Sequence, residues 1–191
     1  MRLTPRTLIA IAPLALLAAC AGSKSSSTAT TAPHAGPTAT AMIEGRSGST
    51  LTGTATFVQN GDAVHVTVDV AGAPEGVHAV HLHEKGDCSA PDAASAGGHF
   101  NPMHMEHGSP DAPSHHAGDF GNMTVGGDGH GHLELDTTML TVLPGDRSVA
   151  GRAIVVHAKE DDMHTQPTGN AGGRIGCGVV AEKPAGAAPA K

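Results

Sequence analysis

The sequence predicts an all-β fold: an eight-stranded Greek-key β-barrel or sandwich with a long metal-binding loop and no major helices. Three observations support this prediction. Short runs rich in Val and Thr alternate in polarity with a period of two, which is typical of half-buried strands. Gly (26) and Pro (13) are frequent between those runs, as expected for many turns. Aromatic residues make up only 2% of the chain, so the core has to be built from small aliphatic side chains.

The predicted strands follow one another along the chain. Residues 51–59 and 63–70 alternate on either side of Asn60-Gly61, a strong short-range signal for a β-hairpin. Further strands are expected at 77–84, on both sides of a turn within 121–139, at 152–159 and at 176–182. The segment 85–120 has no regular periodicity. A loop of this length in a compact domain is expected to be functional or cross-linked, and a metal would supply the cross-link.

The N-terminus has the pattern of a targeting segment. Arg2 and Arg6 precede the apolar run LIAIAPLALLAA at 8–19, which is too short to span a bilayer and has the length of a signal-peptide core. The run ends in LAAC, which resembles the lipobox of bacterial lipoproteins. This resemblance implies cleavage before Cys20 and a lipid anchor on that residue, and Ala21 favours the outer membrane. An ordinary secretory signal with an incidental Cys is the alternative.

These features divide the chain into four parts: a lipoprotein signal peptide at 1–19, a lipidated Cys with a disordered Ser/Thr/Ala/Pro tether at 20–41, a folded domain at 42–182 and a disordered tail at 183–191. The formal net charge is −7 and no basic patch is present, so nucleic acid is not expected as a partner. Cys88 and Cys177 remain as an even pair in an exported chain, and we predict that they form a disulfide.

The 14 histidines point most directly to function, because imidazole is the commonest metal ligand. In the run HLH, His81 and His83 occupy positions i and i+2 of a strand and therefore point to the same face. His157 lies in a second strand. The long loop contributes three histidines and a carboxylate: His99, His107, His116 and Asp119. Two candidate sets follow, an imidazole-rich one suited to copper and one with a carboxylate suited to tetrahedral zinc.

Five motifs occur in a recognisable order: HLHEKGDC, GGHFNP, HHAGDFGN, GRAIVVHAKEDD and GNAGGRIGCG. Together they resemble the copper/zinc superoxide dismutases, and most of all their bacterial periplasmic branch, over about residues 42–182. The spacing of eight residues from His99 to His107 and of nine from there to His116 is also similar to that of the family. The resemblance implies an exported enzyme of the periplasm or cell envelope that converts superoxide to O₂ and H₂O₂ with one copper and one zinc ion per subunit.

The resemblance also implies a role for each residue that matches a family motif. The copper ligands would be His81, His83, His99 and His157. The zinc ligands would be His99, His107, His116 and Asp119. His99 would thus be shared between the metals as a deprotonated imidazole, and would pass a proton to the peroxide. Its double role makes His99 a catalytic residue as well as a ligand.

Three further positions match the family pattern. Arg174 would be the active-site arginine, because a planar guanidinium suits a small oxyanion. Asp161 would join a copper histidine to a zinc histidine, and Cys88–Cys177 would be the family disulfide. The sequence also departs from the eukaryotic branch. The segment before Arg174 is shorter and carries only Lys159 as a cation, and the segment after Cys88 is of the longer bacterial kind, so a monomer and a homodimer both remain open.

Two other classes of protein are compatible with the motifs. A metal-binding lipoprotein would store or deliver copper and zinc on the same fold, and an inactive member would have a structural role. The complete copper set and Arg174 favour the enzyme, because storage needs neither the arginine nor a shared ligand. The other histidines are expected at the surface or in packing. Five of them have no assigned role: His104, His115 and His164 beside the site, and His130 and His132 at a hairpin.

Overall fold

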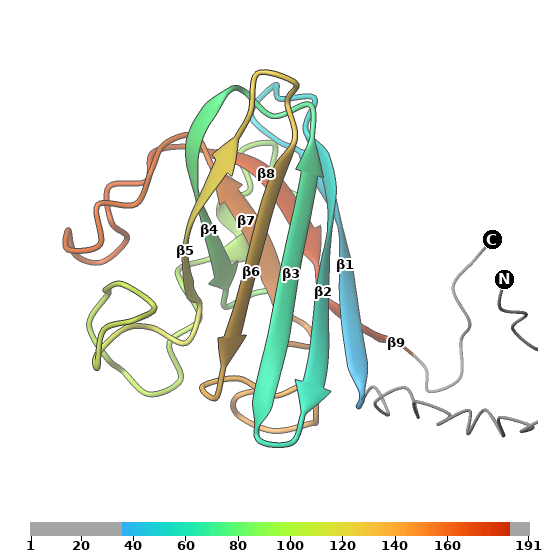
Figure 1. Ribbon diagram of the computed structural model, residues 1–191, viewed down its shortest axis with the longest axis vertical. Helices are drawn as coiled ribbons and strands as arrows, with labels where there is room; N and C mark the ends of the chain where they lie inside the picture. The colour runs from blue at the N-terminus through green and yellow to red at the C-terminus, as the bar shows by residue number, and fades with distance from the viewer. Residues whose placement is uncertain (1–35, 184–191) are drawn as a thin grey trace, which may run out of the picture. The chain divides into compact units, whose positions relative to one another are not determined.

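The computed structural model describes residues 36–183. In this part of the chain nine antiparallel strands form one sheet that curves into a barrel (Figure 1). The strands are β1 (Thr38–Gly45), β2 (Thr52–Asn60), β3 (Ala63–Ala71), β4 (Gly76–His83), β5 (Asp119–Val125), β6 (Gly131–Thr137), β7 (Ala153–His157), β8 (Arg174–Val179) and β9 (Ala181–Lys183). The helical content of the described residues is one short 3-10 turn, η1 (Ala94–Ala96).

Eight of the strands close the barrel, in the order β1-β2-β3-β6-β5-β4-β7-β8 and back to β1. The steps from β3 to β6 and from β4 to β7 join strands that are not consecutive, as in a Greek key. The predicted eight-stranded all-β barrel is therefore confirmed. The run predicted as one strand at 176–182 is instead split at Val180, which exchanges backbone hydrogen bonds with Gly151 and Arg152. The chain continues after it as β9, a ninth strand paired with β1.

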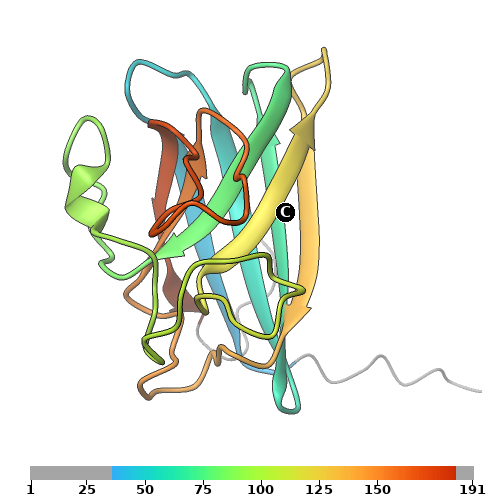
Figure 2. The same cartoon turned by 90° about the vertical axis from the view of Figure 1, so that its left-hand side faces the viewer.

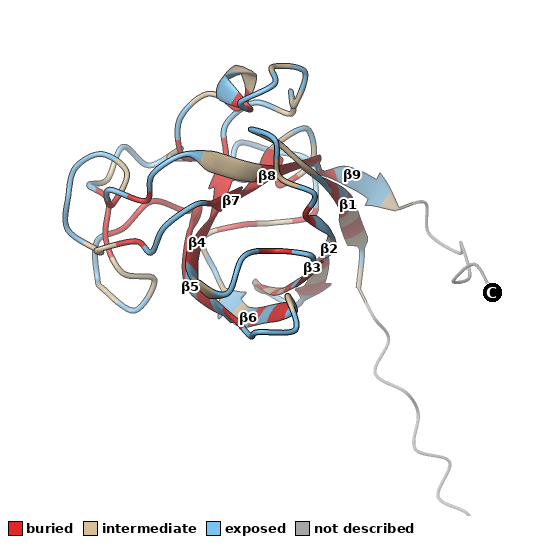
Figure 3. Cartoon of the chain, turned by 90° about the horizontal axis from the view of Figure 1, so that it is seen from above, coloured by how far each residue is buried: buried red, intermediate tan, exposed pale blue. Residues whose placement is uncertain are grey.

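The interior of the barrel is filled by the inward-facing residues of the alternating strands (Figure 3). On β2 and β3 the buried residues are Ala55, Phe57, Val64, Val66, Val68 and Val70. Two of the three phenylalanines meet inside, because the ring centroids of Phe57 and Phe120 are 6.3 Å apart. The core is otherwise built from small aliphatic side chains, as the composition predicts.

Strand β1 corrects the predicted boundary between tether and domain. The strand begins at Thr38, four residues before the predicted start at 42, and its pairing with β2 begins there. The run Thr-Ala-Thr-Ala has the composition of a tether, yet it alternates: Ala39 and Ala41 are buried. Ala39 lies directly opposite Phe57, whose large ring leaves room for only a small neighbour on the same face. Residues 38–41 therefore belong to the fold.

Most of the predicted targeting features lie outside the described residues. These are the signal peptide at 1–19, Cys20, the tether up to residue 35 and the tail after Lys183. Within 36–183, no helix has the length and apolar character that crossing a membrane would require.

Two long loops cover one side of the barrel. The first joins β4 to β5 and spans 84–118, close to the predicted loop at 85–120, and the second joins β7 to β8 and spans 158–173. Figure 2 shows both loops over β4 and β5. Asn122 on β5 fastens the second loop, because its side-chain amide exchanges hydrogen bonds with the backbone of Asp161 at 2.8 and 2.9 Å. The outer face of β4 is thereby enclosed.

Candidate metal centre

Seven side chains from the two predicted sets meet beneath these loops, and all seven are buried. We call His81, His83, His99 and His157 the four-histidine set, and His99, His107, His116 and Asp119 the carboxylate set. Within each set, one donor atom per residue lies within 4.8 Å of the others. His99 belongs to both sets. The structure thus brings together all the residues that were predicted from the sequence as ligands of the two sites.

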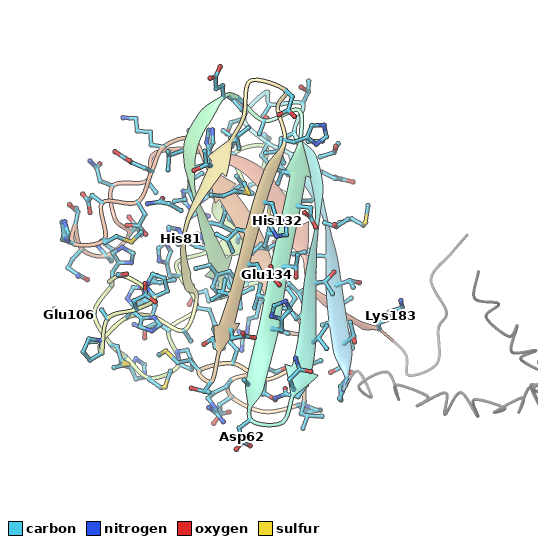
Figure 4. The ribbon with its side chains drawn as sticks, in the orientation of Figure 1. Asp62, His81, Glu106, His132, Glu134 and Lys183 are labelled. Carbon is cyan, nitrogen blue, oxygen red and sulfur yellow. A yellow bond between two sulfur atoms is a disulfide. The ribbon has the colours of Figure 1, made fainter. Side chains whose placement is uncertain are left out.

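The four-histidine set is positioned mainly by strands. Val80 and Leu82 of β4 point into the barrel core, so His81 and His83 between and after them point outward, beneath the loops. Figure 4 shows His81 on this loop-covered side. His157 is the last residue of β7, where the pairing with β8 shifts register between Val156 and His157. Such a shift turns a side chain to a new direction.

Each ring of the four-histidine set has one nitrogen engaged and one free. His81 Nε2 lies 2.8 Å from Asp161 Oδ2, and His83 Nδ1 donates to the Gly97 carbonyl at 2.9 Å. Of the five buried ring nitrogens without a hydrogen-bond partner among the described residues, four belong to this set: His81 Nδ1, His83 Nε2, His99 Nε2 and His157 Nε2. Buried polar atoms without partners are rare and need an explanation. Four such nitrogens in one cluster fit a metal ion that binds imidazole.

The protonation of these rings also suits a metal ion. Burial lowers the pKa of His83 to about 2, and repulsion from the neighbouring histidines acts in the same direction. Burial also lowers the pKa of His99 to about 4, although Asp119 opposes it, and holds the pKa of His157 well below its usual value. These three imidazoles are therefore neutral at physiological pH, and a neutral imidazole keeps the lone pair that binds a metal.

The carboxylate set is arranged around one oxygen. Asp119 Oδ1 lies 2.8 Å from His99 Nδ1, 3.0 Å from His107 Nδ1 and 3.3 Å from His116 Nδ1. The Nδ1 atoms of His99 and His116 are 3.4 Å apart. Ligands held about 2.0 Å from a tetrahedral zinc ion are separated by roughly 3.3 Å. The spacing of these donors, three imidazoles and one carboxylate, therefore fits zinc.

In the carboxylate set the pKa of one histidine, His107, is raised, whereas the resolved histidine pKa values of the other set are lowered. Burial acts against both ionised forms here, but the ion pairing outweighs it. Asp119 and Asp161 raise the pKa of His107 to about 9, and the surrounding histidines hold the pKa of Asp119 well below its usual range. The second oxygen of Asp119 accepts hydrogen bonds from the backbone N–H groups of His116 at 2.8 Å and Gly108 at 3.2 Å. This carboxylate is therefore fixed in position and ionised.

Asp161 connects the two sets. Its Oδ2 contacts His81 Nε2 at 2.8 Å, and its Oδ1 contacts His107 Nε2 at 2.9 Å. The carboxylate is completely buried, and His107 and His81 hold its pKa well below its usual range although burial opposes them. Gly169 packs so closely that a Cβ at this position would overlap Asp161 Oδ1. Asp161 thus has the position, between one histidine of each set, that the resemblance implies.

Arg174 lies beside the four-histidine set. It is the first residue of β8 and pairs with His157. Its Nη1 donates to the Ala93 carbonyl at 2.6 Å and its Nη2 to the Gly97 carbonyl at 2.7 Å. The Gly97 carbonyl also accepts the hydrogen bond from His83, so a single oxygen positions both side chains. Burial lowers the pKa of Arg174, with Asp92 opposing, but an arginine remains a cation in proteins.

The predicted disulfide is confirmed. The sulfur atoms of Cys88 and Cys177 are 2.03 Å apart, and their Cα atoms are 5.8 Å apart. The bond ties the first loop to β8. The same stretch of loop is held by Arg46, whose Nε donates to the Cys88 carbonyl at 3.0 Å. The disulfide therefore fixes the segment that carries Ala93 and Gly97, the two carbonyls that hold Arg174.

Gln166 holds the backbone of His107, and no pattern in the sequence indicates this role. Its Oε1 accepts from the His107 N–H at 2.9 Å, and its Nε2 donates to the His107 carbonyl at 2.8 Å. Among the histidines expected at the surface or in packing, His78 is buried, with its Nδ1 2.8 Å from the His157 carbonyl. His132 lies on the outer face of β6 near Glu134 (Figure 4). No signal in the sequence separates these two environments.

Comparison with known proteins agrees with the geometry. Residues 51–180 match the family model for copper/zinc superoxide dismutase. The chain is 37% identical over 153 residues to an extracellular Cu-Zn superoxide dismutase of Brugia pahangi, and the match covers 75% of each chain. It also resembles the crystal structure of the clock protein EA4, with a TM-score of 0.68 and 37% identity over 75% of this chain and 93% of that one. The chain therefore belongs to the copper/zinc superoxide dismutase family, whose members are oxidoreductases that bind copper and zinc.

Proposed function

We propose that this chain is the superoxide dismutase of a bacterial cell envelope, with copper held by His81, His83, His99 and His157, and zinc held by His99, His107, His116 and Asp119. The position of His99 carries this proposal. Its Nδ1 lies against Asp119 in the carboxylate set, while its Nε2 is buried and unpartnered among the four histidines. A single imidazole with one nitrogen in each set can bridge two metals, a feature that a storage site would not need.

Bound copper would supply one-electron redox chemistry, by which one superoxide is oxidised to O₂ and the next reduced to H₂O₂, whereas zinc is redox-inert. The chain itself manages the proton. Formation of H₂O₂ from superoxide requires two protons: His99 would take up one at Nε2 and deliver it to the departing peroxide as a general acid, and the other comes from solvent. Asp119 holds the opposite side of the ring at 2.8 Å, so the imidazole keeps its orientation as Nε2 changes its protonation.

Arg174 would attract and orient superoxide. Two of the five N–H groups of its guanidinium are engaged by the Ala93 and Gly97 carbonyls. The remaining donors form part of a rigid cation beside His83 and His157. Since the chain as a whole carries a formal charge of −7, attraction of an anion has to be local to the site.

Three observations support export and anchoring. The relative from Brugia pahangi is named as an extracellular enzyme. The Cys88–Cys177 disulfide is of a kind that persists in oxidising compartments. The LAAC run places Cys20 for lipidation and supports a bacterial lipoprotein. The short segment between His157 and Arg174 supports the bacterial branch of the family.

The decisive experiment measures superoxide decay with the purified protein after copper and zinc loading, together with its copper content. We expect rapid catalysed decay, and an inactive protein with copper fully bound would contradict the proposal. Membrane and soluble fractions of expressing cells are assayed in parallel. The Cys20→Ser variant should move the activity out of the membrane fraction.

Arg174→Ala provides a finer test. The rate constant should fall by about tenfold, the lower end of the range for lost electrostatic focusing, while copper content stays unchanged. Arg174→Lys is the matched control. It retains the charge but lacks the planar fork that holds two carbonyls, so its rate should be intermediate. A parallel loss of copper in Arg174→Ala would contradict a role in attracting the substrate.

A further inference from the structure

A cavity of about 510 Å³ lies between the first loop and strands β5 and β6. Asp119 is one of its lining residues, with its carboxylate fully buried on the side of the carboxylate set, so the cavity borders that set. The residues that matter for its chemistry are Asp111, His115, Asp119, Glu134, Asp136 and Met163. No lysine or arginine lines it. The cavity therefore presents carboxylates, an imidazole and a thioether beside a predicted metal site.

His115 is the residue in this cavity that points to a ligand. Its side chain is buried, with 9% of the residue exposed, and its Nδ1 lies 2.8 Å from the carbonyl of His116. The carbonyl can only accept, so Nδ1 carries the hydrogen. Nε2 has no hydrogen-bond partner among the described residues and is absent from the fully enclosed unpartnered nitrogens, so it keeps contact with solvent. In the neutral ring this atom offers a free lone pair.

The same arrangement occurs in the metal centre itself. His83 donates from Nδ1 to the Gly97 carbonyl at 2.9 Å and leaves Nε2 unpartnered in the four-histidine set. A backbone carbonyl on one ring nitrogen fixes the tautomer and orientation of a histidine whose other nitrogen binds a metal. His115 is thus oriented like a metal ligand, although it belongs to neither set.

The charge of the cavity favours a cation. Glu134 and Asp136 line it from β6, and Asp111 from the loop, where Asp111 makes no ion pair with any described residue. His65 faces the two β6 carboxylates from β3, at 2.8 Å from Glu134 Oε1 and 2.9 Å from Asp136 Oδ1. It contacts one oxygen of each, and the second oxygen of Glu134 lies 3.6 Å from His132 Nε2. The three carboxylates, of which Asp111 is the one without an imidazole beside it, raise the local concentration of a divalent cation.

We propose that this cavity is a capture site for Zn²⁺, in which Nε2 of His115 takes the ion from solution and Asp119 receives it into the carboxylate set. Zn²⁺ fits this wall because its protein ligands are imidazole nitrogen and carboxylate oxygen. Asp119 belongs both to the wall of the cavity and to the carboxylate set, so the ion passes between two sites that share a residue. The inference rests on the proposed function only in taking the carboxylate set as the zinc site.

The test compares zinc uptake by the metal-free, disulfide-bonded protein and by His115→Asn. The Asn amide can still donate to the His116 carbonyl but has no atom in place of Nε2. Uptake is followed by stopped flow, with Zn²⁺ supplied from a chromophoric chelator, and the equilibrium affinity is measured separately. We expect the association rate constant to fall by about tenfold, within the range for lost local concentration of an ion. The equilibrium affinity should change by less than about twofold, because His115 is not in the final site.

His104→Asn is the matched control. His104 is exposed in the same loop, does not line the cavity, and has a φ of 55°, which Asn tolerates. Its uptake rate should equal that of the unaltered protein. Equal rates for His115→Asn and the unaltered protein would overturn the proposal. Equal slowing in both variants, or a loss of equilibrium affinity without slowing, would overturn it as well.

Asp111→Asn supplies a second measurement. Since the exposed Asp111 carboxylate acts through its charge, its removal should make the uptake rate less dependent on salt. An unchanged salt dependence would contradict attraction by the cavity.

Superoxide decay by the fully loaded His115→Asn protein should equal that of the unaltered protein. If the loaded unaltered protein is inactive, the proposed function fails while the uptake comparison still stands; if it is active and the uptake rates are equal, only the capture site fails.

Discussion

The four-histidine set and the carboxylate set share His99, yet they are built in different ways. In the first set, His81 and His83 come from β4 and His157 from β7, two strands paired with each other. In the second set, His107 and His116 come from the loop between β4 and β5. Hydrogen bonds of the sheet thus position most of one site, whereas side-chain contacts with a single carboxylate position most of the other.

The two sets also differ in the pKa values of their histidines. His83 and His157 have lowered pKa values, whereas His107 has a raised pKa and lies between Asp119 and Asp161. Before any metal binds, the proton on His107 can hold this residue between Asp119 and Asp161. The four-histidine set needs no such substitute, because the barrel holds it. We therefore expect zinc to displace the proton of His107 when it binds, and copper to fill a site that is already formed.

The largest effect should come from Asp119→Asn. This change removes the oxygen on which three Nδ1 atoms converge, together with its charge. Zinc affinity should fall by more than about 100-fold, since loss of an outer partner alone costs 10- to 100-fold. Copper affinity, measured by competition with a chelator, should fall much less. Equal losses for both metals would show that the two sites are not built independently.

Asn122→Ala is a useful control for this change. Asn122 is a β5 residue three positions from Asp119, and it fastens Asp161 through the backbone rather than contacting a ligand of either set. If its zinc affinity falls as far as that of Asp119→Asn, the loss would come from loosening the loops rather than from the missing carboxylate.

A smaller effect, opposite in its selectivity, should follow from Cys88→Ser combined with Cys177→Ser. The free energy of unfolding should fall by about 3 kcal/mol, a typical value for a native disulfide. The freed segment carries Gly97, whose carbonyl holds both His83 and Arg174. Copper affinity should therefore fall more than zinc affinity. Denaturant unfolding and chelator competition on the same samples would measure this, and a larger loss of zinc would contradict the comparison.

The smallest effect concerns one proton. With a pKa of about 9 in the metal-free protein, His107 is protonated at pH 7, and its Nδ1 can bind zinc only after the ring has lost a proton. Zinc binding at pH 7 should therefore release about one proton from this residue, and affinity should rise with pH until about 9 and then level off. His83, with a pKa of about 2, is already neutral at pH 7, so metal binding at its Nε2 releases no proton. Calorimetry in buffers of different ionisation enthalpy would count the protons, and none released with zinc would contradict this picture.

Much of the barrel could be predicted from the sequence, because apolar and polar residues alternate along its strands. The hairpin of β2 and β3 follows from Val and Thr on either side of Asn60-Gly61. The start of β1 could not be predicted in this way. Its inner residues, Ala39 and Ala41, are too small to mark a buried face, and only the ring of Phe57 on the next strand explains them.

The ligand sets could be predicted because each residue lies within a family motif or, for His107, at the family's spacing from His99. The residues that support them could not. Gln166 and His107 are 59 positions apart, and the contact between them depends on how two loops fold over β4. His104 and His115 share a loop and a residue type, but His104 is exposed whereas His115 is buried and its Nδ1 lies 2.8 Å from the His116 carbonyl. Such differences arise from the backbone path rather than from composition.

The pairing of β9 with β1 has a mechanical consequence. Thr38 and Lys183 lie opposite each other at the ends of two antiparallel strands. A force that pulled these two ends apart would act perpendicular to the strands. It would break the β1–β9 hydrogen bonds one pair at a time, so a small force would be enough at each step. β9 has only three residues and carries no member of either metal set. We therefore expect β9 to detach from β1 under tension before the barrel strands that hold the metal ligands are disturbed.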